Sequence, residues 1–295
     1  MLLATAALWG TGFVAQRSAM EHMKPFLFNT LRYFIGAAIL LPAGHLMLRR
    51  LGVRWDWRVV RDGVILGSVL ALAAGLQQVG IVTTTASRAG FITGLYVLMV
   101  PVFALPFGHR PTGGNLAGAV LAFLGMLLFA ERGAGGSALG DWLVLGSTVA
   151  WALHVVLIGT MAPKRDPTAL VGVQFVAAGL LSGIVVLVFE PIGSVGPVGW
   201  RGAVLPVAYS GLFATAAAFT LQFMAQRDAP PTHATILLSS EALFAAVSAW
   251  LLLGERLGAF ELAGGGLMLA GALVSQLTSR ADAITGTVSD PTPPP

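Results

Sequence analysis

The sequence predicts an all-α membrane protein with ten transmembrane helices, arranged as two inverted five-helix repeats around a central cavity. Hydrophobic residues make up 56% of the 295 positions and charged residues only 10%, whereas soluble domains carry about 25% charged residues. The mean hydropathy is +0.82. A helix needs roughly 20 apolar residues to cross a bilayer, so ten such helices and short loops account for almost the whole chain.

Short segments of the first half recur in the second half, about 144 residues later. Trp151 in AWA follows Trp9 in LWG by 142 residues, and segment 264–271 follows the similar segment 118–125 by 146 residues. Each half holds five expected spans. Because five is odd, the second copy must enter the bilayer inverted relative to the first, as in many secondary transporters. The expected organisation is a first repeat over residues 1–131, a second, inverted repeat over residues 140–280 and a disordered cytoplasmic tail over residues 281–295.

The expected spans follow one another along the chain with short loops between them. The first begins almost at Met1 and lacks the basic region and cleavage site of a signal peptide, so we expect a retained helix. Its missing positive flank favours a native start upstream of Met1 or a trimmed chain. Prolines at 101, 106 and 206 are expected to bend the fourth and eighth spans. The final residues are polar and Pro-rich and bury too little apolar surface to order themselves. In order, the expected spans are residues 2–20, 26–47, 62–83, 89–107, 113–130, 141–160, 168–189, 202–224, 233–253 and 259–278.

Basic residues favour one orientation of these spans. With both termini in the cytoplasm, ten basic residues fall on the inner side and five on the outer side, as the positive-inside rule requires. We therefore expect a multi-pass protein of the cell inner (plasma) membrane with both termini cytoplasmic. The inner residues are Arg49, Arg50, Arg54, Arg58, Arg61, Arg110, Lys164, Arg165, Arg227 and Arg280, and the outer ones are Lys24, Arg88, Arg132, Arg201 and Arg256.

One inner loop, residues 49–63, interleaves arginine with Trp55 and Trp57. Nucleic acid is a conceivable partner for such a loop and for a net charge of +4. Anionic lipid headgroups with interfacial tryptophan explain the pattern better. We therefore expect the lipid bilayer and a small-molecule solute as partners, and no nucleic acid; the oligomeric state is left open.

Glycines recur at the spacing that lets transmembrane helices approach closely. We expect these glycines to pack the bundle, and the motif does not by itself imply dimerisation. The pairs are Gly90 and Gly94, Gly114 and Gly118, and Gly179 and Gly183.

Polar side chains inside the expected spans are the first candidates for a binding site, because a spanning segment avoids such groups unless they have a role. Glu241 lies near the centre of the ninth span, and Arg32 lies in the second. Trp9 and Trp151 occupy equivalent places in the repeats, so they should approach each other and wall a midplane cavity; ordinary lipid-facing or packed tryptophans are the alternative. The candidate substrate-binding residues are Trp9, Gln78, Tyr96, Trp151, His154, Gln174, Gln222 and Ser240.

Three roles are open for Glu241. It could couple transport to protons, form a buried pair with Arg32 that holds the bundle together, or set the potential of a wet cavity. Arg32 is interpreted as structural or as a group at the cavity edge that could meet a substrate carboxylate. His154 is either a binding or proton-relay residue or a hydrogen-bonded packing residue.

Several enzyme and cofactor classes lack their motifs here. The chain has no cysteine, and no GxxxxGK[ST] phosphate loop, HExxH metal site or GxSxG nucleophile elbow occurs. Ser239 and Ser240 have no convincing base. We therefore expect no enzyme activity, no cofactor and no metal.

The sequence resembles the EamA-type ten-helix carriers of the drug/metabolite transporter superfamily. The matching segments are ALWGTGFVAQRSAM (7–20), the LRYFIGAAIL that contains Arg32, TTTASRAGFITGLYVLMVPVFAL (83–105), GDWLVLGSTVAWALHVVLIG (140–159) and SSEALFAAVSAWLLLGERLGAFELAGGGLMLAGALV (239–274). The resemblance implies two inverted five-helix repeats around a substrate cavity, cytoplasmic termini, no nucleotide cofactor and transport of small metabolites, often amino-acid export. One branch exports aromatic amino acids. The fourth span departs from the ninth by ending in FGHRP instead of LLLGER, which weakens any exact symmetry between these two spans.

These observations favour a secondary transporter of small organic metabolites that works by alternating access. An amino-acid exporter, with aromatic or hydrophobic substrates as one option, is the preferred hypothesis. A nucleotide-sugar or drug carrier is the alternative within transport, although phosphates require more basic residues than the spans offer. An intramembrane enzyme and a non-transporting membrane subunit are the alternatives outside it. Proton coupling and facilitated diffusion are both open.

Overall fold

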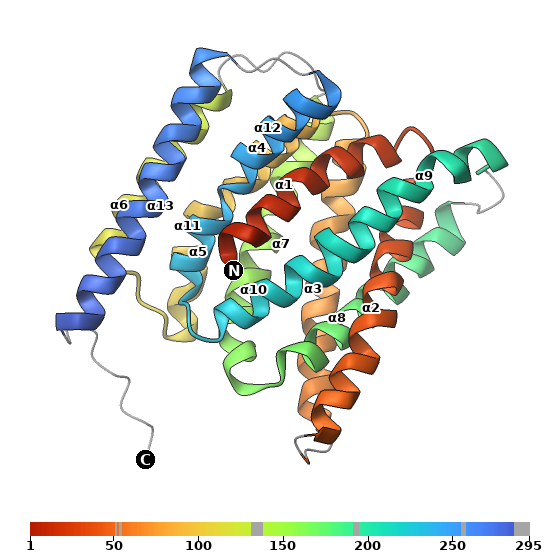
Figure 1. Cartoon of the computed structure of the whole chain (residues 1–295), viewed down its shortest axis with the longest axis horizontal. Coiled ribbons are helices and arrows are strands. Elements are labelled where there is room, and N and C mark those ends of the chain that lie inside the picture. The colour runs from red at the N-terminus through yellow and green to blue at the C-terminus, as the bar shows by residue number, and fades with distance from the viewer. Residues whose placement is uncertain (51, 53–54, 131–137, 191–194, 255–257, 286–295) are drawn as a thin grey trace.

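The computed structural model describes residues 1–50, 52, 55–130, 138–190, 195–254 and 258–285, and in these ranges the chain is helical and contains no strand (Figure 1). Among these described residues, seven helical stretches are long and apolar enough to cross a membrane. The prediction of an all-α membrane protein is therefore confirmed, while the count of ten spanning helices stays a prediction. The seven stretches are Pro25–Arg50, Trp57–Ile81, Ala86–Phe107, Leu139–Lys164, Pro167–Phe189, Pro197–Gln226 and Pro231–Leu253.

Each expected span overlaps a helical segment. The largest differences are in the third and eighth spans, whose helices begin five residues early at Trp57 and Pro197, and in the last span, whose helix continues to Thr285. Residues 281–285 of the expected tail are thus helical, and residues 286–295 lie outside the described part of the chain, as do Arg54, Arg132 and Arg256. The segments are α1 (Leu2–Ala19), α2 (Pro25–Arg50), α3 (Trp57–Ile81), α4 (Ala86–Gly94), α5 (Tyr96–Ala104), η1 (Leu105–Phe107), α6 (Gly113–Ala130), α7 (Ala138–Met161), η2 (Ala162–Lys164), α8 (Pro167–Phe189), α9 (Pro197–Tyr209), η4 (Ser210–Ala217), α10 (Ala218–Gln226), α11 (Pro231–Leu238), α12 (Glu241–Leu253) and α13 (Ala259–Thr285).

Short polar side chains start several of these helices. The Asp56 side chain accepts a hydrogen bond from the Arg58 N–H at the start of α3, and the Asp166 side chain accepts one from the Ala169 N–H at the start of α8. These caps satisfy amide groups that the helix itself leaves free. The loop sequences thus determine where the apolar runs become helical.

The fourth and ninth spans are each interrupted near their centres. Leu95 separates α4 from α5, and Ser239 with Ser240 separates α11 from α12. At both places backbone hydrogen bonds reach back three residues, as in the bond from the Leu95 N–H to the Ile92 carbonyl, so the helix tightens locally. The expected bend at Pro101 does not coincide with the break, because Pro101 lies inside α5.

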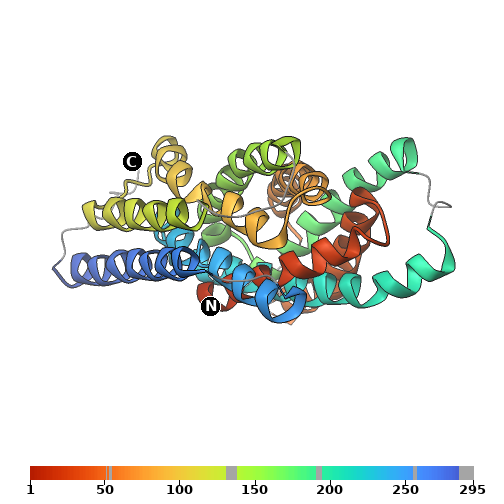
Figure 2. The ribbon, with the colours of Figure 1, turned by 90° about the horizontal axis from the view of Figure 1, so that it is seen from above.

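The helices of the two halves interleave. Helix α2 packs against α8, α3 packs against α7 and α8, and α1 packs against α12. Helices α6 and α13 lie side by side at one edge of the bundle, and Figures 1 and 2 agree on this placement. The tertiary contacts of the first half are therefore largely contacts with the second half.

Glycines let α6 and α13 approach until their backbones meet. A Cβ atom added to Gly118 would lie 2.6 Å from the Gly271 carbonyl oxygen, and one added to Gly125 would lie 2.5 Å from that of Gly264. Since residue numbers rise along one helix as they fall along the other, the pair is antiparallel. The predicted packing role is confirmed for Gly118, and Gly114 likewise has no room for a side chain beside Thr278.

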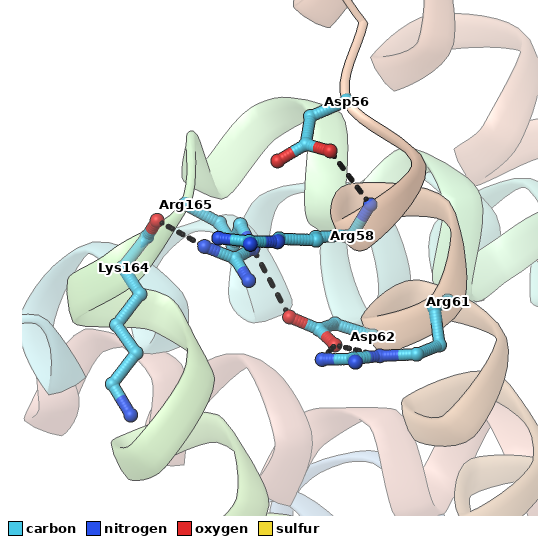
Figure 3. A network of polar contacts seen from close by, with 6 residues as sticks. All are labelled: Asp56, Arg58, Arg61, Asp62, Lys164 and Arg165. Atoms are coloured by element: carbon cyan, nitrogen blue, oxygen red, sulfur yellow. Dashed lines mark hydrogen bonds and ion pairs between the residues drawn. The ribbon is translucent and has the colours of Figure 1, made fainter.

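Ion pairs link the two halves of the chain near both ends of the contact between α3 and α7, through Arg165 just before α8 and Arg88 in α4. Figure 3 shows one end, where buried Asp62 at the start of α3 lies between Arg61 and Arg165, with oxygen–nitrogen distances of 2.6 and 3.0 Å. At the other end Arg88 pairs with Asp141 of α7 at 2.8 Å. Each end thus links a residue of the first half to one of the second.

Replacing Asp62 with asparagine is expected to lower the free energy of unfolding by about 2 kcal/mol, because it leaves Arg165 without its anion. The loss should be smaller than for a fully buried pair, since Arg61 is half exposed. Unfolding in detergent measures it. Asp56→Asn is the control, because asparagine is an equally good helix cap; equal losses in the two variants would contradict the prediction.

Candidate functional site

Three aromatic rings meet at the centre of the bundle. The ring centroids of Trp9 in α1 and Trp151 in α7 are 6.3 Å apart. Phe219 in α10 lies 5.0 Å from the Trp9 ring and 6.4 Å from the Trp151 ring. The two tryptophans that the repeat relates therefore do approach each other, and the third ring of the cluster comes from the second half.

This aromatic cluster forms part of the wall of a cavity that encloses about 40 Å³, room for a few water molecules. Its lining comes from both halves of the chain. The lining residues are Trp9, Phe13, Gln16, Arg32, Gln77, Thr93, Tyr96, Trp151, Val155, Ala214, Phe219 and Glu241.

Several polar atoms of the cavity wall have no hydrogen-bond partner in the described part of the chain. They are Gln16 Oε1, Arg32 Nε, Trp151 Nε1, Glu241 Oε1 and the Tyr96 hydroxyl, which lies close to Glu241. Leaving a buried polar group unpaired is costly. These atoms give the cavity wall hydrogen-bonding groups that a polar solute could use.

The two buried charges of the wall have no ion-pair partner among the described residues, and they are not paired with each other. Arg32 donates from Nη2 to the Tyr33 hydroxyl at 3.1 Å and stacks over the rings of Phe28 and Tyr33. Glu241 begins α12, directly after the break in the ninth span. The described geometry therefore gives no support to a buried Arg32–Glu241 pair.

Five of the sequence-predicted residues line this cavity: Trp9, Arg32, Tyr96, Trp151 and Glu241. The other five are not part of its lining: Gln78, His154, Gln174, Gln222 and Ser240. Whether any of them binds a solute stays a prediction.

Most of the predicted residues outside the lining form hydrogen bonds with other side chains or the backbone. Each also has one buried polar atom without a partner in the described part of the chain: Gln78 Oε1, His154 Nδ1, Gln174 Nε2, Gln222 Oε1 and the Ser240 hydroxyl. His154 Nε2 and Gln174 Oε1 are 2.8 Å apart and join α7 to α8. The His154 ring also packs edge-on against Trp151 and Phe219. These contacts match the interpretation of His154 as a hydrogen-bonded packing residue that supports the cavity wall from behind.

The glutamines of the third and eighth spans behave similarly. Gln222 donates to Gln226 Oε1 at 2.9 Å, and Gln226 in turn donates to the Val155 carbonyl. Gln78 makes a long contact of 3.5 Å to the Gln16 carbonyl. Ser240 lies at the break before α12, and its hydroxyl is buried.

Some lining residues that were not predicted lie at helical spacing from the two predicted tryptophans. Phe13 and Gln16 follow Trp9 by four and seven residues, and Val155 follows Trp151 by four, so each lies on the same helix face as its tryptophan. Gln77 donates to Thr93 at 2.8 Å, a pairing between two helices that spacing does not reveal. The places of Ala214 and Phe219 in the cavity wall depend on the backbone conformation of the eighth span.

The eighth span contains a π-helical segment, η4, that bonds to Trp9. The Ala218 N–H bonds to the Phe213 carbonyl, five residues back, instead of to the Ala214 carbonyl that an α-helix would use. The Ala214 carbonyl accepts a hydrogen bond from Trp9 Nε1 at 2.9 Å. The backbone irregularity thus fixes the orientation of the Trp9 ring.

The two related tryptophans should consequently respond differently to substitution. Trp9→Phe removes the hydrogen bond from Trp9 to the Ala214 carbonyl. It should cost about 2 kcal/mol more in unfolding free energy than Trp151→Phe, because the Trp151 indole N–H has no partner in the described part of the chain. Both variants lose the same ring volume, so the difference isolates the hydrogen bond. Unfolding of the two proteins in one detergent measures it, and equal losses would refute the assignment.

An all-helical membrane bundle with a buried polar and aromatic cavity at its centre is the architecture of a membrane carrier. A family model described as the EamA-like transporter family matches residues 1–130 and again residues 138–277. The chain therefore belongs to the EamA-like transporter family, which confirms the resemblance seen in its sequence.

Proteins similar to this chain include transporters. An uncharacterized transporter of Archaeoglobus fulgidus is 29% identical over 281 residues, covering 94% of this chain and 84% of that protein. The threonine/homoserine exporter RhtA of Escherichia coli is 30% identical over 183 residues, covering 60% of this chain and 59% of the exporter. A solved protein structure superposes with a TM-score of 0.75 at 23% identity over 95% of this chain and 97% of its own, and this likeness concerns the fold alone.

Proposed function

We propose that this chain is a secondary transporter that exports amino acids, moving them through the central cavity by alternating access. The cavity carries the proposal, because aromatic rings and unpaired polar atoms from both halves meet there. The similarity to a threonine/homoserine exporter over 60% of the chain supports amino acids as the solute class. No cofactor or enzymatic step takes part.

We further propose that the two halves are inverted repeats, residues 1–131 and 140–280. The separate matches of one family model to residues 1–130 and 138–277 support this division. Reciprocal contacts support it as well, since Gly118 and Gly125 of α6 meet Gly271 and Gly264 of α13 at equivalent places. Rocking of the two halves would then open the cavity to each side in turn. The proposed location is the inner (plasma) membrane, with ten spans and both termini in the cytoplasm.

Counterflow in proteoliposomes tests the function. Vesicles that contain the purified protein and a high internal concentration of one amino acid should accumulate the same labelled amino acid from outside, whereas protein-free vesicles should not. A panel of small, aliphatic and aromatic amino acids identifies the preferred solutes. Absence of counterflow for every member would overturn the proposal. Net transport in vesicles with an imposed proton gradient then separates the mechanisms. Collapsing the gradient should leave facilitated diffusion unchanged and should stop the accumulation that proton coupling drives.

A further inference from the structure

The cavity wall contains one buried basic side chain, Arg32, and one buried acidic side chain, Glu241, and neither has an ion-pair partner among the described residues. Arg32 is 6% exposed and Glu241 is 3% exposed. Arg32 belongs to the first half of the chain and Glu241 to the second. An uncompensated charge at membrane depth is expensive, so its persistence calls for a partner that the described protein groups do not supply.

Other buried acids of the described chain show how such groups are normally satisfied here. Asp62 is bound by Arg61 and Arg165. Glu190 accepts hydrogen bonds from the backbone N–H groups of Phe26 and Leu27 at 3.2 and 2.9 Å. Glu241 has no such bonds to its Oε1 atom, although the chain provides them for carboxylates elsewhere.

Arg32 is held in place without using an anion. Its guanidinium carbon lies 5.4 Å from the Phe28 ring centroid and 4.9 Å from that of Tyr33, and Nη2 donates to the Tyr33 hydroxyl. Stacking on aromatic rings positions a guanidinium while leaving its remaining donors free for a carboxylate. The Arg32 side chain is thus oriented before any solute binds.

We propose that the cavity recognises zwitterions by their two ends: Arg32 binds the carboxylate and Glu241 binds the ammonium group of one solute molecule. This inference rests on the proposed transport function and assigns the groups that select its substrates. A solute with both charges neutralises both ends of the site. A solute that lacks one charge leaves the opposite protein charge buried and unpaired, which is the source of the selectivity.

The prediction for the wild-type protein concerns three forms of one amino acid. L-threonine carries both charges, N-acetyl-L-threonine lacks the ammonium group and L-threonine methyl ester lacks the carboxylate. The purified protein in detergent should bind threonine on the order of 100-fold more tightly than either derivative. The corresponding forms of L-phenylalanine serve as a second set, so that the choice of side chain does not decide the outcome.

Two variants then test which side chain binds the ammonium group and which binds the carboxylate. Glu241→Gln should abolish the preference for threonine over its N-acetyl form and retain the preference over the ester. Arg32→Gln should do the reverse, and Arg32→Lys, which keeps the charge and guards against loss of folding, should restore much of the preference over the ester. Glu21→Gln and Arg17→Gln, which change residues outside the cavity lining, should leave both preferences unchanged.

Three results would overturn the proposal: no saturable binding of either amino acid, equal binding of all three forms, or loss of both preferences together in both charge-removing variants. An unchanged N-acetyl discrimination in Glu241→Gln would likewise remove Glu241 from the site. Binding in detergent requires no transport, so a protein that shows the crossed pattern but no counterflow would contradict the export function and leave the recognition site standing.

Discussion

Replacing Gly118 with leucine is expected to prevent α6 and α13 from packing and to give a protein that does not assemble into its native bundle. Even the first side-chain carbon would lie 2.6 Å from the Gly271 carbonyl oxygen, which is backbone and has no rotamer to change. Lipid provides no hydrophobic drive to hold two helices together, so their association depends on close van der Waals contact. The loss should exceed about 3 kcal/mol, the upper range for overpacked sites that can still relax.

A neighbouring glycine gives the matched control. Gly266 is exposed on α13, with no atom near the place its Cβ would occupy, so Gly266→Leu should fold as the wild-type protein does. Size-exclusion elution and thermal unfolding in detergent compare the two variants. A monodisperse Gly118→Leu protein with unchanged thermal stability would show that α6 and α13 do not need this contact.

Gly10→Ala is expected to abolish or strongly reduce solute transport while most of the bundle persists. The new methyl group would lie 2.7 Å from both the Glu241 carbonyl oxygen and the Ala245 nitrogen, and it would also overlap Phe244 Cβ. Helix α12 must therefore move away from α1. Because Glu241 begins α12 and Trp9 precedes Gly10, this shift changes the cavity wall directly. The cost in stability should be about 2 kcal/mol.

Counterflow and thermal unfolding together measure this effect. Gly146→Ala is the control, because Gly146 lies in α7 and faces open space, and alanine is the better helix former by about 1 kcal/mol. That variant should transport normally with equal or higher stability. Normal transport by Gly10→Ala would mean that the α1–α12 contact does not position the cavity wall.

The recurrence in the sequence located part of the candidate site. Trp9 and Trp151 were paired by their offset of 142 residues, and their rings do meet at the centre of the bundle. Arg32 and Glu241 were found because charged side chains are rare in spanning segments. These signals identify which residues are unusual, and five of the ten residues so chosen line the cavity.

The same signals could not show which way each side chain points. The spans are apolar on nearly every face, so no amphipathic pattern reveals the rotation of a helix about its axis. Gln174 and Gln16 are equally unusual by composition, yet Gln174 bonds to His154 outside the cavity lining while Gln16 lines the cavity. Pro206 predicts a bend in the eighth span, but the sequence did not predict the π-helical segment that follows it and bonds to Trp9.

The sequence by itself determined that this chain is a helical membrane protein and where most of its helices lie. In lipid the backbone N–H and C=O groups of a long apolar run must form hydrogen bonds within the protein, and only a helix or a closed barrel allows this. The tertiary structure alone decided which polar groups face the cavity and which satisfy one another. That choice depends on helix rotation, on the breaks before Tyr96 and Glu241 and on contacts between the two halves, all of which arise only when the helices pack.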